Sequence, residues 1–255
     1  MTNERRVLVH PDDDALVAAV AARFTTKVID LMDEFDVVNV VLTGGTAGGG
    51  VQRSIAASKM RTAIDWTRVH IWWGDERFVP KHHPDRNEVQ AREAMLDHLP
   101  LPESNIHPFP ASDEIEDIDA AAAAYADVLQ QFAPDGSALP RFDITFLGVG
   151  PDGHIASLFP ERPLSHGPAT VIGVRNSPKP PPDRLSLTLP ALNTSHRIWM
   201  VVAGAEKAMA LGLALAGASK DEVPVAGVQG RKRTVFFVDS AAAQNVPQNL
   251  IAQSY

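Results

Sequence analysis

The chain contains no cysteine. Disulfide bonds, zinc–thiolate centres and thiol nucleophiles are therefore excluded. It also has no apolar run of about 18 residues, so the sequence predicts no membrane span. The first ten residues lack the apolar stretch of a secretory signal, and we expect a cytoplasmic protein.

Basic residues are in deficit. There are 23 Lys and Arg against 31 Asp and Glu, which gives a formal net charge of −8. Nucleic-acid binding needs a basic face that displaces counterions from phosphates, so we expect no nucleic-acid partner. A small phosphorylated ligand is still allowed, because it needs only a few basic groups that converge locally.

The remaining composition suits one large globular domain or two small ones. The chain has 255 residues, of which 45% are hydrophobic. We expect one α/β domain over residues 1–255 that is a monomer or weak homo-oligomer.

Short β-branched runs alternate with alanine-rich segments at helical spacing. Strands are predicted at 5–10, 37–42, 69–73, 142–147, 170–175, 185–189, 197–203 and 234–238. Helices are predicted at 12–34, from a glycine-rich turn to about 58, at 87–99, 115–132 and 205–215, and at the C-terminus. This order predicts a doubly wound, mainly parallel, Rossmann-like sheet with helices on both faces. The proline-rich segment 177–183 predicts an extended linker.

Ligands of such sheets bind beyond the carboxyl ends of the strands. The strand at 37–42 is followed by Gly44, Gly45 and Thr46 in a glycine-rich segment, 43–50. Glycines let the backbone approach a ligand, and the next helix would direct N–H groups at an anion. The Thr46 hydroxyl could add a donor or cap the helix. A flexible turn is the alternative, because neither GxGxxG nor GxxxxGK[ST] is present.

Two cations also follow predicted strands. Arg77 ends the segment Gly-Asp-Glu-Arg after 69–73, and an arginine there can bind phosphate through two parallel hydrogen bonds. A local salt-bridge cluster is the alternative. Lys207 lies in the first turn of a predicted helix, where a cation opposes the helix dipole. A shared anion would relieve that conflict, although an exposed lysine is also possible.

The richest segment is 148–160, after the strand at 142–147. Its glycines permit a tight turn that exposes Asp152 and His154. Histidine is the usual general base near neutral pH, and a carboxylate two residues away could orient it. A structural histidine that caps a helix is the alternative. Ser157 lies in no GxSxG elbow, so we interpret it as a helix residue rather than a nucleophile.

At these residues the sequence resembles the 6-phosphogluconolactonase family, within the glucosamine/galactosamine-6-phosphate isomerase superfamily. The motifs are TGGTAGG (43–49), WWGDERFVP (72–80), FLGVGPDGHIASLFP (146–160), SPKPPPDRLSLTLPALN (177–193) and GAEK (204–207). The family often has Ser-Thr-Pro after its paired glycines, where this chain has Thr-Ala-Gly. The missing proline loosens the start of the helix but leaves its backbone donors in place.

The resemblance implies hydrolysis of 6-phospho-D-glucono-1,5-lactone to 6-phospho-D-gluconate, in the oxidative pentose phosphate pathway. Such lactones already open spontaneously, so we expect no metal and no cofactor. The resemblance assigns the activation of water to His154, with Asp152 as an acid beside it. It assigns substrate and phosphate binding to five residues: Gly44, Gly45, Thr46, Arg77 and Lys207.

Two alternatives stay open. The first is an aldose–ketose isomerase or deaminase of amino-sugar phosphates, which needs a second carboxylate after His154. Glu161 lies seven residues further on, but the segment between them matches the lactonase better. The second alternative is a non-catalytic sugar-phosphate sensor on the same fold. Such regulators usually carry a DNA-binding module, and none is visible in this sequence.

Overall fold

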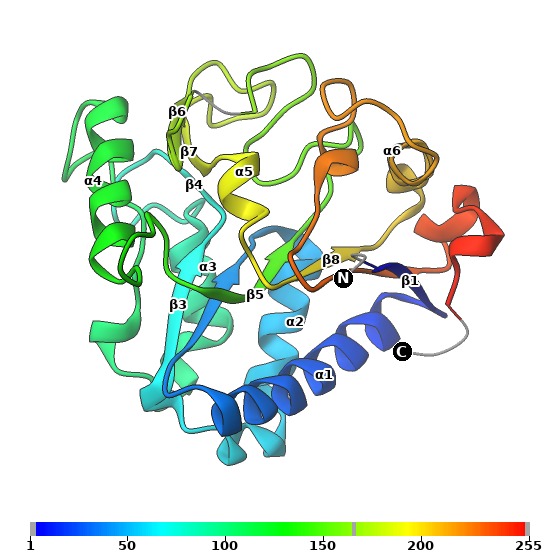
Figure 1. Ribbon diagram of the computed structural model, residues 1–255, viewed down its shortest axis with the longest axis horizontal. Helices are drawn as coiled ribbons and strands as arrows, with labels where there is room; N and C mark the ends of the chain where they lie inside the picture. The colour runs from blue at the N-terminus through cyan, green and yellow to red at the C-terminus, as the bar shows by residue number, and fades with distance from the viewer. Residues whose placement is uncertain (1–3, 165–166, 253–255) are drawn as a thin grey trace.

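A six-stranded parallel sheet lies at the centre of the molecule (Figure 1). The computed structural model describes residues 4–164 and 167–252, so the ends of the domain expected over 1–255 lie outside the described residues. Neighbouring strands are all parallel, in the order β1-β9-β8-β5-β2-β3. Their bounds are β1 Glu4–His10, β2 Val38–Leu42, β3 Val69–Trp73, β5 Phe142–Leu147, β8 Arg197–Val202 and β9 Arg233–Asp239.

Helices cover both faces of this sheet (Figure 1). On one face α1 (Asp13–Glu34), α2 (Gly45–Ala57) and α3 (Asn87–Ala94) pack in sequence against one another. Toward the other face lie α4 (Ile118–Gln131) and α5 (Leu189–Leu192). The helix α6 (Ala208–Leu215) follows β8. The expected α/β class and doubly wound arrangement are confirmed.

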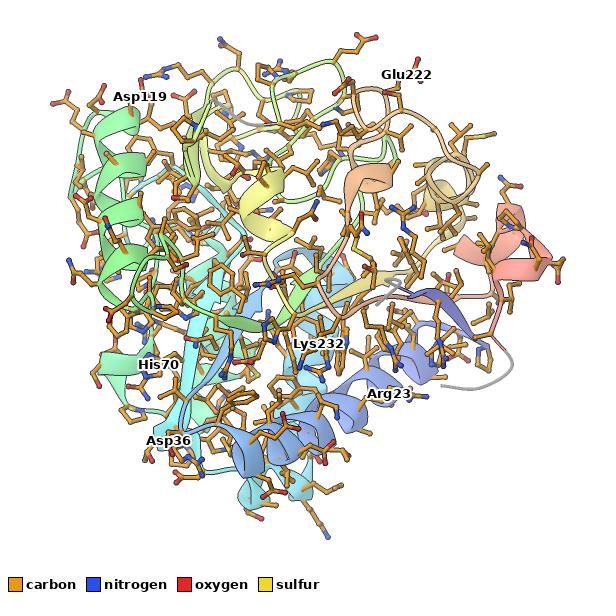
Figure 2. The ribbon with its side chains drawn as sticks, in the orientation of Figure 1. Arg23, Asp36, His70, Asp119, Glu222 and Lys232 are labelled. Carbon is orange, nitrogen blue, oxygen red and sulfur yellow. The ribbon has the colours of Figure 1, made fainter. Side chains whose placement is uncertain are left out.

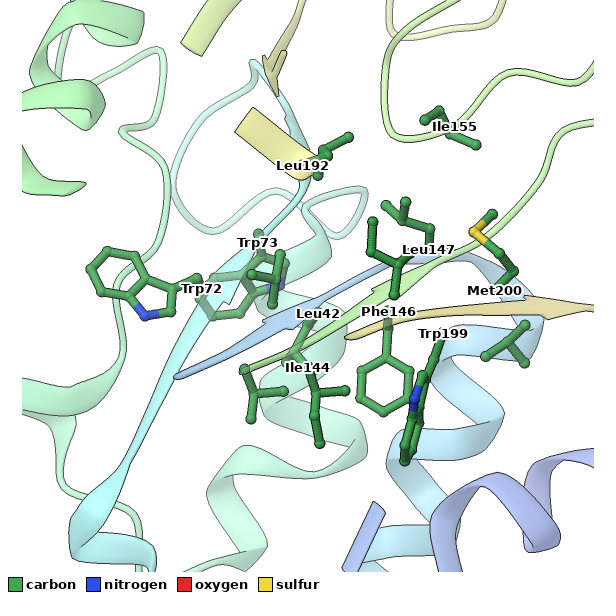
Figure 3. Packing of buried hydrophobic residues seen from close by; sticks show 14 of the residues in the cluster. Leu42, Trp72, Trp73, Ile144, Phe146, Leu147, Ile155, Leu192, Trp199 and Met200 are labelled. Atoms are coloured by element: carbon green, nitrogen blue, oxygen red, sulfur yellow. The ribbon is translucent and has the colours of Figure 1, made fainter. Parts of the chain in front are cut away.

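The β-strands bury alternate side chains on opposite faces of the sheet (Figure 3). Phe146 and Trp199 face the side of α1, where the Phe146 ring lies 5.7 Å from Phe24 and 5.6 Å from Trp199. Leu147 and Met200 point to the opposite side. All of these side chains are buried. The strands are therefore held from both faces, as the continuous apolar runs predict.

A second sheet has three antiparallel strands in the order β4-β7-β6. The strands predicted at 170–175 and 185–189 are β6 (Val171–Val174) and β7 (Arg184–Leu187). The third, β4 (Asp75–Arg77), was not predicted, because three charged residues after a strand are typical of a loop. This strand gives Arg77 a fixed backbone.

Several local predictions were wrong. No α-helix forms near the C-terminus of the described chain, where Pro247 separates two short 3-10 helices; residues 253–255 lie outside the described residues. The helix predicted at 87–99 ends at Ala94. The segment 177–183 is not extended but closes on itself, since the Ser177 N–H donates to the Pro182 carbonyl at 2.7 Å. The 3-10 helices are η1 Lys59–Ala63, η2 Trp66–Arg68, η3 Leu96–His98, η4 Glu103–Asn105, η5 Ala205–Lys207, η6 Pro224–Gly227, η7 Ala242–Asn245 and η8 Gln248–Leu250.

Among the described residues, no helix combines the length and the apolar character needed to span a bilayer.

A histidine pair packs beside β3. His107 stacks on Trp72 with ring centroids 4.0 Å apart, and its Nε2 lies 3.0 Å from Nδ1 of His70. Figure 2 labels His70. Burial, and then the neighbouring His70, lower the pKa of His107 from 6.5 to about 4. The folded state therefore disfavours a charge on this ring.

We predict that this ring makes the protein less stable in acid. Between pH 4 and 6.5, His107 is protonated in the unfolded state but neutral in the folded state. The free energy of unfolding therefore rises with pH across that window. The full contribution is about 3 kcal/mol. Urea unfolding of wild type and His107→Phe at several pH values measures it. The unfolding free energy of wild type minus that of His107→Phe should increase as the pH rises from 4 to 6.5. A difference that stays constant over this range would contradict the prediction.

Candidate active site

A cavity of about 600 Å³ opens where the parallel strands end. Its lining includes 43–48 after β2, 148–150 after β5, 203–204 after β8, and Asp239 at the end of β9. Parallel strands bring their carboxyl ends to one edge, so segments far apart in the sequence meet there. The volume suits a small-molecule ligand.

His154 and Asp152 form a hydrogen-bonded pair at this cavity. Nδ1 of His154 lies 2.5 Å from Oδ1 of Asp152. His154 lines the cavity, and its side chain is 16% exposed. Burial alone would raise the pKa of Asp152, but the hydrogen bond and charge of His154 outweigh it and lower that pKa to about 2. The carboxylate is therefore ionised at neutral pH and orients the ring, which leaves Nε2 for chemistry.

Gly150 makes room for this pair. A Cβ atom at Gly150 would overlap the His154 ring and the Asp152 carboxylate. The Gly150 N–H donates to the His154 carbonyl at 2.9 Å and its carbonyl accepts from Gly153, which closes the turn. The glycine therefore permits a backbone approach that any side chain would block.

Arg77 is held by Asn87. Nη1 of Arg77 donates to Oδ1 of Asn87 at 2.6 Å and to the carbonyl of Asp85 at 2.8 Å. Its buried Nε has no hydrogen-bond partner in the described part of the chain. Arg77 itself lines the cavity, so its guanidinium group can meet an acceptor there such as a phosphate oxygen.

The same asparagine packs against the glycine-rich segment. A Cβ atom at Gly44 would overlap Oδ1 of Asn87, so only glycine fits there. Glu76 fixes the backbone of this asparagine. The Glu76 carboxylate accepts hydrogen bonds from the backbone N–H groups of Arg77 (2.8 Å), Asn87 (2.6 Å) and Glu88 (2.9 Å). Burial raises the pKa of Glu76 to about 7, against the lowering effect of Arg86 and these three donors.

The glycine-rich segment is helical, not a turn. The α2 helix starts at Gly45, with Gly44 as its N-cap and no side-chain cap bond. Thr46 therefore does not cap the helix, although it lines the cavity with Gly44 and Gly45. The first N–H groups of a helix lack partners within it, and these face the ligand cavity.

Lys207 is the last residue of η5 and lies directly before α6. Its Nζ is 3.7 Å from a carboxylate oxygen of Glu206. Burial lowers the pKa of Lys207; Glu206 opposes this and Lys179 adds to it. Lys207 and Lys179 both line the cavity. Two neighbouring ammonium groups disfavour each other, and an anion between them would favour both.

Sequence reasoning missed Arg184 and Lys179, although both belong to the quoted motif SPKPPPDR. Arg184 is buried on β7 and donates to the carbonyls of Lys179 (3.2 Å), Pro180 (3.1 Å) and Pro181 (3.3 Å). It thereby holds the 177–183 loop over the cavity. Asn87 was also missed, since an asparagine in a loop carries no signal. Four acids line the cavity as well: Asp13, Asp75, Glu206 and Asp239.

The structure therefore brings together His154, Arg77, Lys207 and the 44–46 segment in one cavity. Asp152 is not part of the lining, but it contacts the cavity through His154.

Glu161, the carboxylate weighed for an isomerase, is exposed and lies outside the lining. Ser157 lies in a turn bracketed by the Ile155–Leu158 bridge, so its assignment to a helix was wrong. In residues 4–164 and 167–252, no three His, Asp or Glu side chains are grouped so as to hold a metal ion.

Known proteins resemble this chain over almost its whole length. The family model described as Glucosamine-6-phosphate isomerases/6-phosphogluconolactonase matches residues 11–237. The 6-phosphogluconolactonase of Streptomyces coelicolor is 47% identical over 255 residues, covering 98% of each chain. That of Mycobacterium tuberculosis is 42% identical and covers 94% of this chain and 97% of its own.

Solved structures agree. The 6-phosphogluconolactonase of Thermotoga maritima superposes with a TM-score of 0.81 at 30% identity, covering 93% of this chain and all of its own. A monomeric glucosamine-6-phosphate deaminase has a TM-score of 0.77 at 19% identity, covering 94% of this chain and 99% of its own, which shows the shared fold alone. The resemblance seen in the sequence motifs is thus confirmed: the chain belongs to the glucosamine-6-phosphate isomerase/6-phosphogluconolactonase family.

Proposed function

We propose that this protein hydrolyses 6-phospho-D-glucono-1,5-lactone to 6-phospho-D-gluconate. One observation carries the proposal: the Asp152–His154 pair meets the same cavity as Arg77 and Lys207. A base and an anion anchor on one small cavity fit a substrate with a reactive ring at one end and a phosphate at the other. The names of relatives up to 47% identical support the same activity.

The phosphate is bound by Arg77, Lys207 and the start of α2. Arg77 lines the cavity with its guanidinium group, and the charged form of Lys207 becomes more favourable beside a dianion. The backbone N–H groups at Gly45 and Thr46 add donors at a helix N-terminus. Anchoring the phosphate in this way places the lactone carbonyl at a set distance from His154.

His154 acts as a general base. Its Nδ1 proton is held by Asp152, so Nε2 removes a proton from water as the water attacks the lactone carbonyl. The attack makes a tetrahedral oxyanion, and backbone N–H groups at Gly44 or Gly45 are our candidates to stabilise it. Collapse breaks the ring ester bond, and the released ring oxygen takes up a proton to become a hydroxyl. Such lactones also open spontaneously, so the reaction needs no acyl-enzyme.

A coupled assay tests the function. The lactone is supplied, 6-phosphogluconate is followed through its dehydrogenase, and the enzyme-free rate is subtracted. A rate no higher than that blank would overturn the proposal. Ammonia release from glucosamine 6-phosphate would instead indicate the deaminase alternative, and ligand binding without turnover would indicate a sensor.

Replacement of His154 by alanine should remove most of the catalysis. General-base help is worth about 10²–10⁴-fold, so kcat should fall by at least about 100-fold. The thermal unfolding midpoint should stay close to that of wild type, because the ring lies at the cavity rather than in the core. His82→Ala, which changes an exposed loop histidine outside the cavity lining, is the matched control and should leave kcat unchanged. A stable His154→Ala protein with normal turnover would contradict the role of His154.

Gly150→Ala should inactivate the enzyme through geometry alone. The added methyl group overlaps the His154 ring, so the ring must turn away and kcat should drop at least tenfold. Gly74→Ala is the matched control, because a Cβ there meets neighbours only at 3.6 Å or more. Steady-state kinetics of both variants measure the effect. Equal losses in the two variants would speak against a special role for Gly150.

Arg77→Ala should act mainly on KM. Loss of a charge-assisted pair of hydrogen bonds to phosphate costs about 2–3 kcal/mol, so KM should rise by about 30- to 150-fold, with a smaller change in kcat. Arg77→Lys should recover only part of the affinity, since an ammonium group cannot form the paired bonds. Unchanged KM in Arg77→Ala would mean that the phosphate binds elsewhere.

A further inference from the structure

Ser157 has a buried hydroxyl that the proposed reaction does not use. Its side chain is 1% exposed, and its Oγ donates to Oδ2 of Asp75 at 2.7 Å. Its backbone N–H donates to Oγ of Ser186 at 3.3 Å. A hydroxyl enclosed in this way is no nucleophile, because neither water nor substrate reaches it. It lies three residues after His154, in the next turn of the chain, between Ile155 and Leu158.

Asp75 continues the connection toward Arg77. Nδ2 of Asn87 donates to the Asp75 carbonyl at 2.8 Å and lies 3.4 Å from its Oδ1. Oδ1 of Asn87 in turn accepts from Arg77 at 2.6 Å. Four side chains, Ser157, Asp75, Asn87 and Arg77, thus form one continuous chain of hydrogen bonds. It runs from the turn that carries the base to the cation that anchors the phosphate.

We propose that Ser157 is a positioning residue that sets the place of Arg77 relative to His154. The inference rests on the proposed function, since it concerns the two ends of that substrate. Hydrolysis from a bound complex depends on the distance between the anchored phosphate and the base. The hydrogen bond from Ser157 joins the segment after β5 to the strand β4, which carries Arg77.

Loss of the hydroxyl would free the carboxylate of Asp75. That side chain is 7% exposed and lines the cavity. A buried carboxylate oxygen deprived of its donor is unfavourable, so the group should turn to find another partner. Asn87 contacts this carboxylate at 3.4 Å and also binds Arg77, so a turn of the carboxylate would disturb the support of Arg77. We therefore expect the effect of Ser157 to reach the phosphate end of the ligand through Arg77.

A double-mutant cycle tests this route. The dissociation constant of 6-phosphogluconate is measured by calorimetry for wild type, Ser157→Ala, Arg77→Ala and the double variant. In the wild-type background, Ser157→Ala should weaken binding about five- to tenfold. In the Arg77→Ala background, the same change should weaken it less than about twofold. Equal factors in both backgrounds, or no effect in wild type, would overturn the proposal.

Two further variants separate positioning from packing. Ser157→Cys keeps the volume but supplies only a weak S–H donor, so it should bind as poorly as Ser157→Ala. Binding like wild type would show that volume alone matters and would refute the proposal. Ser195→Ala is the matched control. It also removes a buried hydroxyl, which forms a 2.7 Å hydrogen bond with the Thr145 hydroxyl, and neither residue lines the cavity. It should lower stability and leave the dissociation constant unchanged.

The binding readout also separates this inference from the proposed function. Coupling between Ser157 and Arg77 in a protein that fails to open the lactone would support positioning and refute hydrolysis. Lactone turnover without coupling between Ser157 and Arg77 would support hydrolysis and refute positioning. A wild-type protein that neither binds 6-phosphogluconate nor opens the lactone would refute both.

Discussion

The site depends on the parallel alignment of the central strands. Because β2, β5, β8 and β9 all run the same way, the residues that follow them share one edge of the sheet. The apolar side chains above and below the strands fix that alignment, with rings such as Phe146 and Trp199 packed on one face (Figure 3). Rigid strands hold their ends within narrow limits, which is the precision that a bound complex requires.

The cavity gathers cations although the chain as a whole is acidic. The net charge is −8, yet Arg77, Arg184, Lys179 and Lys207 converge on one cavity. Acidic side chains line the same cavity and reduce the repulsion between the cations. Partial burial lowers the pKa of Lys207 and of Arg184, and an incoming phosphate would favour the charged form of each. Binding energy therefore comes from a local arrangement and not from the overall charge.

Buried polar groups set the geometry of the cavity wall. Glu76 gathers three backbone donors and orders the start of α3, which places Asn87 beside Arg77. Hydrogen bonds are stronger in a buried, low-dielectric environment, so a network of this kind favours one arrangement of its members. Two glycines also set the geometry of the cavity wall. Gly44 and Gly150 admit neighbouring side chains where a Cβ atom would overlap them.

The sequence by itself determined the α/β class, most strand positions and the principal residues of the cavity. Apolar runs mark buried strands, and residues just after parallel strands must meet, so Arg77, His154 and Lys207 could be found from local patterns. Local patterns could not find Asn87 or Arg184, whose roles arise from contacts with other parts of the chain. They misplaced Ser157 for the same reason: its partner Asp75 is 82 positions away in the sequence. Only tertiary structure decides such pairs, because a hydrogen bond depends on distance in space and not on separation along the chain.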